Sequence, residues 1–273
     1  MKLKDKVVVI TGAGLESGFG WAIALEMAAE GGHVVVTDIS SRYPNLPDYA
    51  LGTTEDIEKR VAELKALGND AMGLVCDVRS KTSVQAMVKA VVRKYGKINI
   101  LVNNAGFVRV APFLDIDEEI WDMHQDVMPK GTFLCSQAVV PEMKKTGERG
   151  KIINISSMAG LVGAGFAAAY CAAKFAQVGL TKALAQELAP QNINVNAICP
   201  GLMTQAHVGR QYAVGAAEAL GTSAEAATGL FLSRMPMGRM GTPEDVAKAA
   251  LFLASPDSDH ITGVALEVSG GQR

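Results

Sequence analysis

Cysteine is scarce in this chain of 273 residues, which has only four. Cys76, Cys135, Cys171 and Cys199 lie far apart, in a spacing that fits neither a zinc motif nor a dense disulfide framework. The four histidines also lack metal-ligand spacing. We therefore expect reduced thiols, a cytoplasmic location and no metal site.

An excess of charge of one sign is also absent, because 26 basic residues face 28 acidic ones. This balance argues against a nucleic-acid partner. Long apolar runs are missing too: the segment 158–173 is shorter than a membrane-spanning helix and contains three glycines. The apolar run 7–10 is too short for a signal peptide. We expect a soluble protein with no membrane partner.

Short runs rich in β-branched residues are abundant, by contrast. They are apolar nearly throughout, as expected for strands of a parallel sheet buried on both faces. Seven such runs occur, at 6–11, 33–38, 71–77, 98–104, 151–156, 193–198 and 263–268.

Helical patterns fill the intervals between these runs. They cover 19–30, 54–67, 80–95, 116–145, 168–189 and 243–254. Alternating strands and helices predict an α/β fold, a doubly wound parallel seven-stranded sheet with helices on both faces. Such sheets bind ligands beyond the carboxyl ends of their strands. Because no linker or internal repeat interrupts the pattern, we expect a single domain over 1–273.

Two stretches break the alternation. Residues 40–53 are Pro-rich and too long for an ordinary connection between a strand and a helix. Residues 202–240 contain Ala-rich, helix-compatible sequence but no strand pattern. They predict an excursion over the ligand edge, which is either a mobile lid or a packed pair of surface helices.

A glycine-rich segment, 11–20, follows the first predicted strand and opens a helix. Glycines permit a tight turn and close approach of the backbone, and a helix N-terminus offers free N–H groups to a pyrophosphate. In this context the loop predicts a dinucleotide site.

Asp38 ends the second predicted strand, where a carboxylate can accept both hydroxyls of an adenosine ribose and repel a 2′-phosphate. Glu16 in the glycine loop argues in the same direction. Arg42 is the opposing signal, because an arginine here can hold a 2′-phosphate. We favour NAD as the cofactor, with an NADP-dependent ketone reductase as the alternative.

Tyr170 and Lys174 are four residues apart and share one helix face. An ammonium beside a phenol favours the phenolate, which can then exchange a proton with a substrate oxygen. Ser157, at the end of the fifth predicted strand, supplies a hydroxyl that could hold the same oxygen. The glycine loop, Asp38 and Ser157 all lie at the ends of predicted strands. Together with Tyr170 and Lys174 they predict a catalytic group.

With these motifs the sequence resembles the short-chain dehydrogenase/reductase family in its single-domain form. The matching segments are 11–20, 76–78, 103–106, 155–157, 170–174, 196–201 and 241–245. The resemblance implies hydride transfer between a nicotinamide and a carbonyl or alcohol carbon, and a homo-oligomer, often a tetramer. It implies that Tyr170 is the general acid/base, that Ser157 orients the substrate oxygen, and that Lys174 binds the nicotinamide ribose.

The expected cofactor-binding residues follow from the loop, the second strand and the resemblance together. They are Gly12, Gly14, Gly18, Phe19, Gly20, Asp38, Asp77, Val78, Asn104, Ala105, Gly106, Tyr170, Lys174, Pro200, Gly201 and Thr204.

Three departures from the family pattern stand out. The glycine loop is longer between Gly12 and Gly18, and Thr204 follows Pro200 by four positions where five is commoner. Met128 occupies the place of the family's catalytic asparagine, and a thioether cannot replace an amide in a water-mediated proton relay. Pro129 follows directly and predicts a kink.

The expected walls of the substrate pocket are mostly apolar, which favours a secondary alcohol or ketone with an apolar or cyclic body. They are Phe107, Val108, Met158, Val162, Phe166 and Met203. Arg109 is expected as a solvated rim residue, with a contact to a substrate carboxylate or sulfonate as the alternative. A catalytically weak dinucleotide-binding sensor or scaffold is the rival hypothesis, supported by Met128. An enoyl reductase is disfavoured, because its tyrosine-to-lysine spacing is normally longer.

Overall fold

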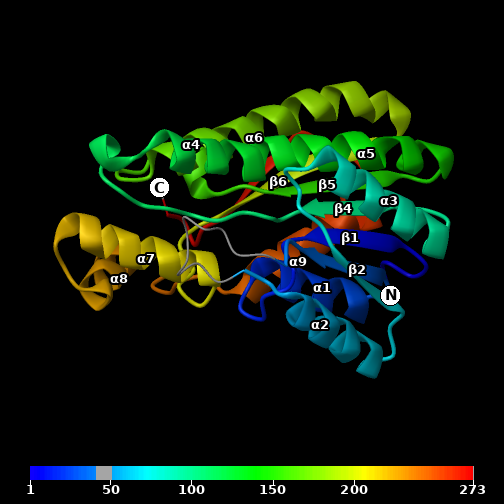
Figure 1. Ribbon diagram of the computed structural model, residues 1–273, viewed down its shortest axis with the longest axis horizontal. Coiled ribbons are helices and arrows are strands. Elements are labelled where there is room, and N and C mark those ends of the chain that lie inside the picture. The colour runs from blue at the N-terminus through cyan, green and yellow to red at the C-terminus, as the bar shows by residue number, and fades with distance from the viewer. Residues whose placement is uncertain (41–50, 273) are drawn as a thin grey trace.

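The computed structural model describes residues 1–40 and 51–272, in which seven parallel strands form one sheet with the order β3-β2-β1-β4-β5-β6-β7 (Figure 1). The strands are β1 (Val7–Thr11), β2 (His33–Asp38), β3 (Ala71–Val75), β4 (Ile100–Asn103), β5 (Gly150–Ile155), β6 (Ile193–Pro200) and β7 (Ala265–Val268). The predicted doubly wound α/β fold is confirmed. The strand order changes direction between β1 and β4, which places a ligand-binding crevice at their carboxyl ends.

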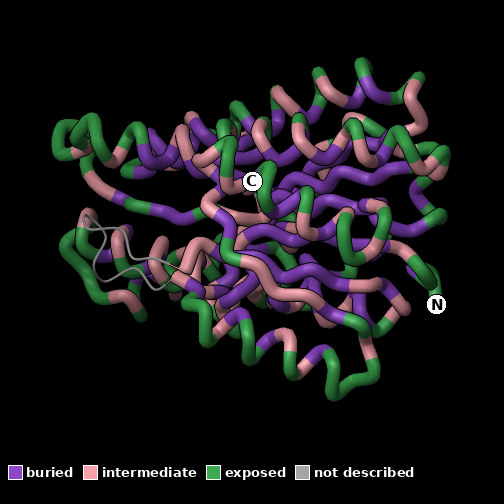
Figure 2. Tube along the Cα trace, turned by 45° about the vertical axis from the view of Figure 1, so that its right-hand side comes forward, coloured by how far each residue is buried: buried purple, intermediate pink, exposed green. Residues whose placement is uncertain are grey.

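Helices cover both faces of the sheet, with α3 to α6 on one face and α1, α2 and α9 on the other (Figure 1). The helices are α1 (Phe19–Ala29), α2 (Thr54–Ala66), α3 (Lys81–Tyr95), α4 (Glu118–Gln125), α5 (Gly131–Lys145), α6 (Ala168–Leu188), α7 (His207–Leu220), α8 (Ala224–Ser233) and α9 (Pro243–Ala254). The buried backbone follows the strands and the inner sides of these helices (Figure 2). A separate hydrophobic core therefore lies on each face of the sheet.

The helix boundaries follow local sequence signals. Thr53 begins α2 with a capping box, because its hydroxyl accepts from the backbone N–H of Asp56 while the Asp56 carboxylate accepts from the N–H of Thr53. Thr242 begins α9 in the same way. Gly96 ends α3 in the left-handed conformation, with φ of 76°.

The prediction of one continuous helix over 116–145 is wrong. The chain forms α4, then a π-helical turn at Asp126–Lys130, then α5. Pro129 lies inside this turn and has no N–H to donate, so the regular hydrogen-bond pattern cannot pass through it. The sequence predicts a kink at Pro129, and the structure has a π-helical turn there.

The 202–240 excursion consists of α7 and α8, joined at Gly221. The pair lies at the end of the molecule where the strands finish, on the left of Figure 1. The start of α7 is bonded to the glycine loop: the N–H of His207 donates to the carbonyl of Ser17 at 3.1 Å, and Arg210 donates to its hydroxyl at 2.8 Å. The excursion thus spans the ligand edge and contacts the glycine loop directly.

Arg42, the residue weighed as a ligand for a 2′-phosphate, lies outside the described residues together with most of the 40–53 stretch. Across the part of the chain that is described, every helix is too short or too polar to span a bilayer.

Candidate active site

The glycine loop begins where β1 ends, and its shape depends on two glycines. Gly12 has a φ of +65°, and a Cβ there would lie 2.7 Å from the Cα of Ala105. At Gly20 a Cβ would lie 2.6 Å from the side-chain nitrogen of Asn104. Gly18 caps α1 without any side-chain hydrogen bond, and Gly18 and Phe19 line the cleft, so the N-terminus of α1 lies beside it. This arrangement fits a pyrophosphate.

Asn104 fixes the loop from the neighbouring strand. Its amide donates to the carbonyls of Thr11 and Gly12, both at 2.8 Å. The Thr11 hydroxyl accepts in return from the backbone N–H groups of Asn104 and Ala105, both at 3.1 Å. The ends of β1 and β4 are therefore held together beneath the cleft.

Asp38 is buried at the end of β2. Its carboxylate accepts from the N–H of Gly14 at 2.9 Å and from the N–H of Ile39 at 2.8 Å. Burial raises the pKa of this carboxyl, and the backbone N–H groups oppose the shift. A Cβ on Gly52 would lie 2.7 Å from the carboxylate, so a glycine is needed where the chain passes over it. The N–H of Gly52 also bonds to this carboxylate, which as an acceptor of up to about four hydrogen bonds can still accept from a ribose hydroxyl.

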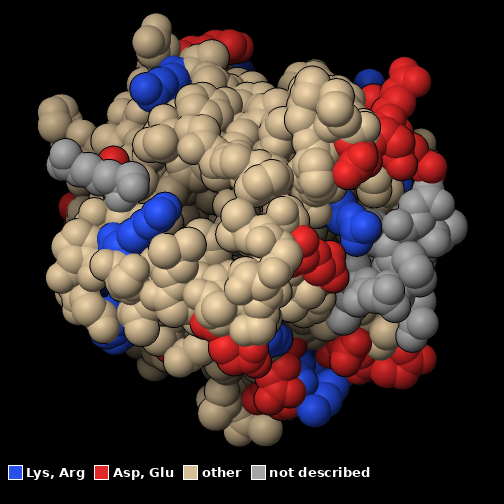
Figure 3. All heavy atoms as spheres, turned by 90° about the vertical axis from the view of Figure 1, so that its left-hand side faces the viewer, with Lys and Arg blue, Asp and Glu red and all other residues tan. Residues whose placement is uncertain are grey.

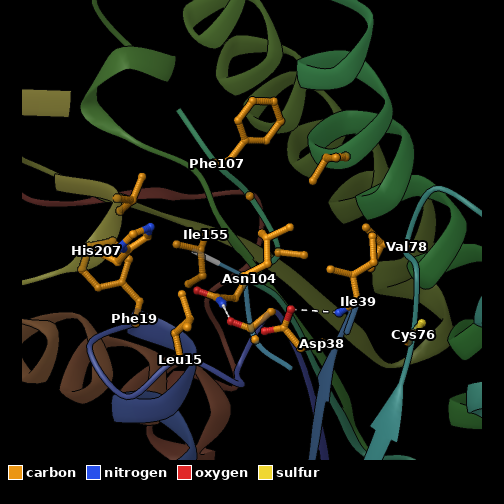
Figure 4. Close-up of a pocket in the computed structure, with 18 of the residues that line it drawn as sticks. Leu15, Phe19, Asp38, Ile39, Cys76, Val78, Asn104, Phe107, Ile155 and His207 are labelled. Atoms are coloured by element: carbon orange, nitrogen blue, oxygen red, sulfur yellow. Dashed lines mark hydrogen bonds between the residues drawn. The ribbon is translucent and has the colours of Figure 1, made fainter. Parts of the chain in front are cut away.

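The cleft above the loop is shown in Figure 4. Asp38 and Val78 lie on one side, Phe19 and His207 lie on the other, and Asn104 lies between them. The predicted cofactor residues that line it are Gly12, Gly18, Phe19, Asp38, Asp77, Val78, Asn104, Ala105, Gly106, Tyr170 and Lys174. The donor set and shape fit a nicotinamide dinucleotide.

Asp77 is engaged in an ion pair at the edge of this cleft. Its carboxylate accepts from Nε of Arg79 at 2.9 Å and from Nη2 at 2.8 Å. The Arg79 guanidinium and the backbone N–H of the same residue hold the pKa of Asp77 below its usual value, although burial opposes them. The ion pair with Arg79 therefore holds the Asp77 carboxylate at this edge of the cleft.

Tyr170, Lys174 and Ser157 converge at the inner end of the cleft. Tyr170 and Lys174 lie one turn apart on α6, with the Lys174 nitrogen 5.6 Å from the centre of the tyrosine ring. Nζ of Lys174 donates to the Ile155 carbonyl at 2.8 Å and to Oε1 of Gln177 at 2.9 Å. Ser157 follows β5, and its hydrogen bond with Tyr170 lowers the pKa of the phenol. The structure thus brings together the three predicted catalytic residues.

Desolvation dominates the electrostatics of this group. Burial raises the pKa of the Tyr170 phenol well above its usual range, against the smaller effect of Ser157. Burial also lowers the pKa of Lys174 to about 7. The lysine can therefore change charge near neutral pH, and its hydrogen-bond partners decide how readily it keeps its proton.

A second cleft opens on the other side of Tyr170. It is lined by Phe19, Val108, Ser156, Ser157, Met158, Ala159, Val162, Gly163, Ala164, Tyr170, Pro200, Gly201, Leu202, Met203, Val208, Gly209, Tyr212, Phe231 and Gln272. None of the described residues that line it is charged. Seen from this end, the centre of the molecule is largely uncharged, with most charged side chains toward the rim (Figure 3). Tyr170 lines both clefts and marks their junction.

Most of the predicted substrate walls lie in this second cleft, with two exceptions. Phe107 lines the first cleft, and Phe166 lines neither. Sequence reasoning missed Tyr212, Phe231 and Gln272. Tyr212 and Phe231 come from α7 and α8 and pack together with ring centres 5.9 Å apart. Their distance along the chain from the catalytic residues hid this contribution.

The other predicted cofactor residues do not line the first cleft. Gly14 contacts Asp38 behind the loop, and Pro200 and Gly201 line the second cleft. Thr204 lines neither cleft, and its hydroxyl lies 3.3 Å from the sulfur of Met240. Arg109 lies on a separate surface depression rather than in the substrate cleft.

Met128 is fully buried and packs toward Gly106, where a Cβ would lie 3.5 Å from the methionine sulfur. Gln177 is the polar residue that sequence reasoning missed here. It is buried on α6, three residues after Lys174, and that spacing is the signal that could have identified it.

His124 proves to be structural. It accepts from the N–H of Arg109 at 3.2 Å, bonds to the carbonyl of Ile120 at 2.7 Å, and packs against Phe107. Burial lowers its pKa to about 4. Over residues 1–40 and 51–272, no cluster of three His, Cys, Asp or Glu side chains could bind a metal.

A parallel sheet with a glycine loop, a terminal Asp38 and a Ser-Tyr-Lys group defines an oxidoreductase of the nicotinamide-dependent class. A family model described as "Enoyl-(Acyl carrier protein) reductase" matches residues 12–273. The chain belongs to the short-chain dehydrogenase/reductase family and acts on alcohol or ketone groups with a nicotinamide cofactor.

Relatives of the chain match it over nearly its whole length. It is 38% identical to the 3-oxoacyl-[acyl-carrier-protein] reductase FabG of Thermotoga maritima, over 99% of each chain. It is also 38% identical to the (2S)-[(R)-hydroxy(phenyl)methyl]succinyl-CoA dehydrogenase subunit BbsD of Thauera aromatica, over 100% of this chain and 98% of that protein. Among solved structures, NAD+-bound xylitol dehydrogenase superposes with a TM-score of 0.90 at 33% identity, covering 99% of this chain and 100% of the other.

Proposed function

We propose that the chain is an NAD-dependent alcohol dehydrogenase or ketone reductase in which Ser157, Tyr170 and Lys174 carry the chemistry. The convergence of these residues where the two clefts meet is the observation that supports the proposal. The chain would work as one domain over 1–273, with 202–240 covering the substrate.

Tyr170 would exchange a proton with the substrate oxygen, and Ser157 would hold that oxygen by a hydrogen bond. Lys174 would bind the ribose of the cofactor and favour the phenolate of Tyr170 by its charge. The nicotinamide supplies or accepts the hydride. Because both Tyr170 and Lys174 are desolvated, their mutual attraction is stronger here than in water.

NAD is favoured over NADP by the position of Asp38. Its carboxylate is buried, bonded to two backbone N–H groups and part of the cleft wall. A 2′-phosphate would bring a second negative charge against it. The NAD-bound solved relative is consistent with this choice.

The second cleft favours an uncharged substrate with an apolar body. Val108, Met158, Met203 and Phe231 supply apolar surface, whereas Tyr212 supplies a polar group opposite. A secondary alcohol or ketone with a cyclic or hydrophobic body would bury this surface. A substrate carboxylate or phosphate would meet no lining cation among the described residues.

We also propose a homo-oligomer, a tetramer by the resemblance, in the cytoplasm. Large apolar side chains are exposed on the helical layer formed by α4, α5 and α6: Trp121 at 41%, Phe133 at 44% and Phe175 at 45%. Burial of such side chains against another copy is favourable. All four cysteines are free thiols, which fits a reducing compartment.

A panel of secondary alcohols and ketones, assayed with NAD and with NADP by the absorbance of the reduced nicotinamide, tests this proposal. We expect turnover of apolar cyclic substrates with NAD. Charged analogues of the same ring provide the matched control and should react poorly. Exclusive turnover of charged substrates, or of NADP, would contradict the proposal.

A further inference from the structure

Lys174 is held by a buried hydrogen-bond chain that leads away from the cleft. Its nitrogen donates to Oε1 of Gln177 at 2.9 Å, and Nε2 of Gln177 donates to the hydroxyl of Thr132 at 2.8 Å. All three residues are at most 4% exposed. The chain connects α6 to the first turn of α5, directly after the π-helical turn.

The amide of Gln177 is fixed in one orientation by these contacts. Its oxygen faces the lysine and its nitrogen faces the threonine. Thr132 follows the turn that contains Met128 and Pro129, neither of which has a side chain able to accept a hydrogen bond from the lysine amine as an amide oxygen does. In the described residues, the acceptors on Lys174 are therefore Gln177 and the Ile155 carbonyl.

We propose that Gln177 is a positioning residue of this enzyme: it holds the Lys174 amine in place and in its protonated form. The inference rests on the proposed roles of Tyr170 and Lys174. A carbonyl acceptor bonds more strongly to an ammonium than to a neutral amine, so Gln177 supports the charge that burial disfavours. Thr132 in turn keeps the Gln177 oxygen directed at Lys174.

The other titratable groups around Lys174 have pKa values away from neutral pH, which simplifies a test by pH dependence. Tyr170 lies on the same helix, Cys199 faces it from β6, and His124 faces it from α4. Burial raises the pKa of Cys199 to about 11 and lowers that of His124 to about 4. Tyr212 faces Tyr170 from α7, and burial raises its pKa as well. Near neutral pH, the loss of the proton from Lys174 is therefore the expected event.

The pH dependence of ketone reduction gives the readout, because this direction requires protonated Tyr170 and charged Lys174. The rate should be constant at acidic pH and fall as Lys174 loses its proton. In Gln177→Leu the falling limb should move to lower pH by about one to two units, the equivalent of one hydrogen bond to a charged group. The rate should then drop at least roughly tenfold above the midpoint and match the unmodified enzyme below it.

Gln177→Glu offers the opposite perturbation, because a carboxylate beside the lysine favours the ammonium. Its falling limb should move to higher pH. Gln191→Leu, just after the end of α6 and bonded only to the carbonyl of Glu187 in the described chain, is the matched control and should keep the original limb. Thr132→Val should move the limb in the same direction as Gln177→Leu, and it supplies the test if the leucine variant does not fold.

A merely structural role for Gln177 predicts a loss of rate that is equal at every pH. That result, or an unmoved limb in folded Gln177→Leu and Gln177→Glu, would overturn the inference. Tyr170→Phe separates this failure from failure of the proposed function. If Tyr170→Phe abolishes turnover while the Gln177 variants keep the original limb, only the inference about Gln177 is wrong. If Tyr170→Phe retains turnover, the proposed function itself is wrong.

Discussion

Replacement of Asp38 by alanine should narrow the preference for NAD over NADP. Asp38 is 8% exposed, and its carboxylate accepts from the N–H groups of Gly14 and Ile39, so it is fixed in the wall of the cleft. Two like charges about 4 Å apart repel by about 4 kcal/mol at an effective dielectric constant of about 20, and we take this value for the repulsion between the carboxylate and a 2′-phosphate.

That repulsion corresponds to a preference for NAD of roughly a thousandfold in kcat/KM. In Asp38→Ala the preference should fall to within roughly tenfold. NAD itself should be used less well, because its ribose hydroxyls lose their acceptors. The assay is kcat/KM for each coenzyme with one fixed substrate, followed by the absorbance of the reduced nicotinamide.

Glu16→Gln is the matched control, because it removes a carboxylate from the glycine loop that is 72% exposed and lies near Arg60 and Lys59. Its effect on the preference should stay within roughly threefold. The account of Asp38 would be refuted if the unmodified enzyme used NADP as well as NAD, or if Asp38→Ala left the ratio unchanged.

Two further variants test other parts of the account. Met128→Asn should change turnover by no more than roughly tenfold, because the Lys174 amine is already held by Gln177 and Ile155; a gain of several orders of magnitude in kcat would mark the natural protein as impaired. His124→Gln should flatten the acid dependence of stability. The folded pKa of about 4 lies below the ordinary value of 6.5, so the unfolded state binds more protons between these values and the free energy of unfolding falls as pH drops through that window. Denaturation by urea should show about 2 kcal/mol less loss between pH ~7 and ~5 in the variant, and equal losses would contradict a neutral, buried His124.

The fold could be predicted from the sequence because its strongest signals are local. Apolar β-branched runs and glycine stops mark the strands and helices, since a strand buried on both faces tolerates few polar side chains. The break after α4 was harder to predict from the sequence. Pro129 indicates an irregularity, but whether the chain kinks or forms a π-helical turn depends on how α4 and α6 pack around it.

The site was predictable where a motif lies within one element or at the end of one strand, as for Tyr170, Lys174 and Asp38. Contacts between distant elements were not. The role proposed for Gln177 depends on its hydrogen bond with Thr132 on another helix. Tyr212 lines the substrate cleft because of the path that the 202–240 excursion takes. Pairings of this kind depend on tertiary packing, which neither periodicity nor spacing reports.

Turnover by Tyr170→Phe tests the central claim most directly, because the change deletes the phenolic hydroxyl at the junction of the two clefts and keeps the ring. Measured with NAD and the best substrate of the panel, kcat should fall by roughly 100- to 10,000-fold, the usual cost of a lost general acid/base, while the Kd for NADH stays within roughly threefold. Undiminished turnover in this variant would contradict the account and place the chemistry elsewhere.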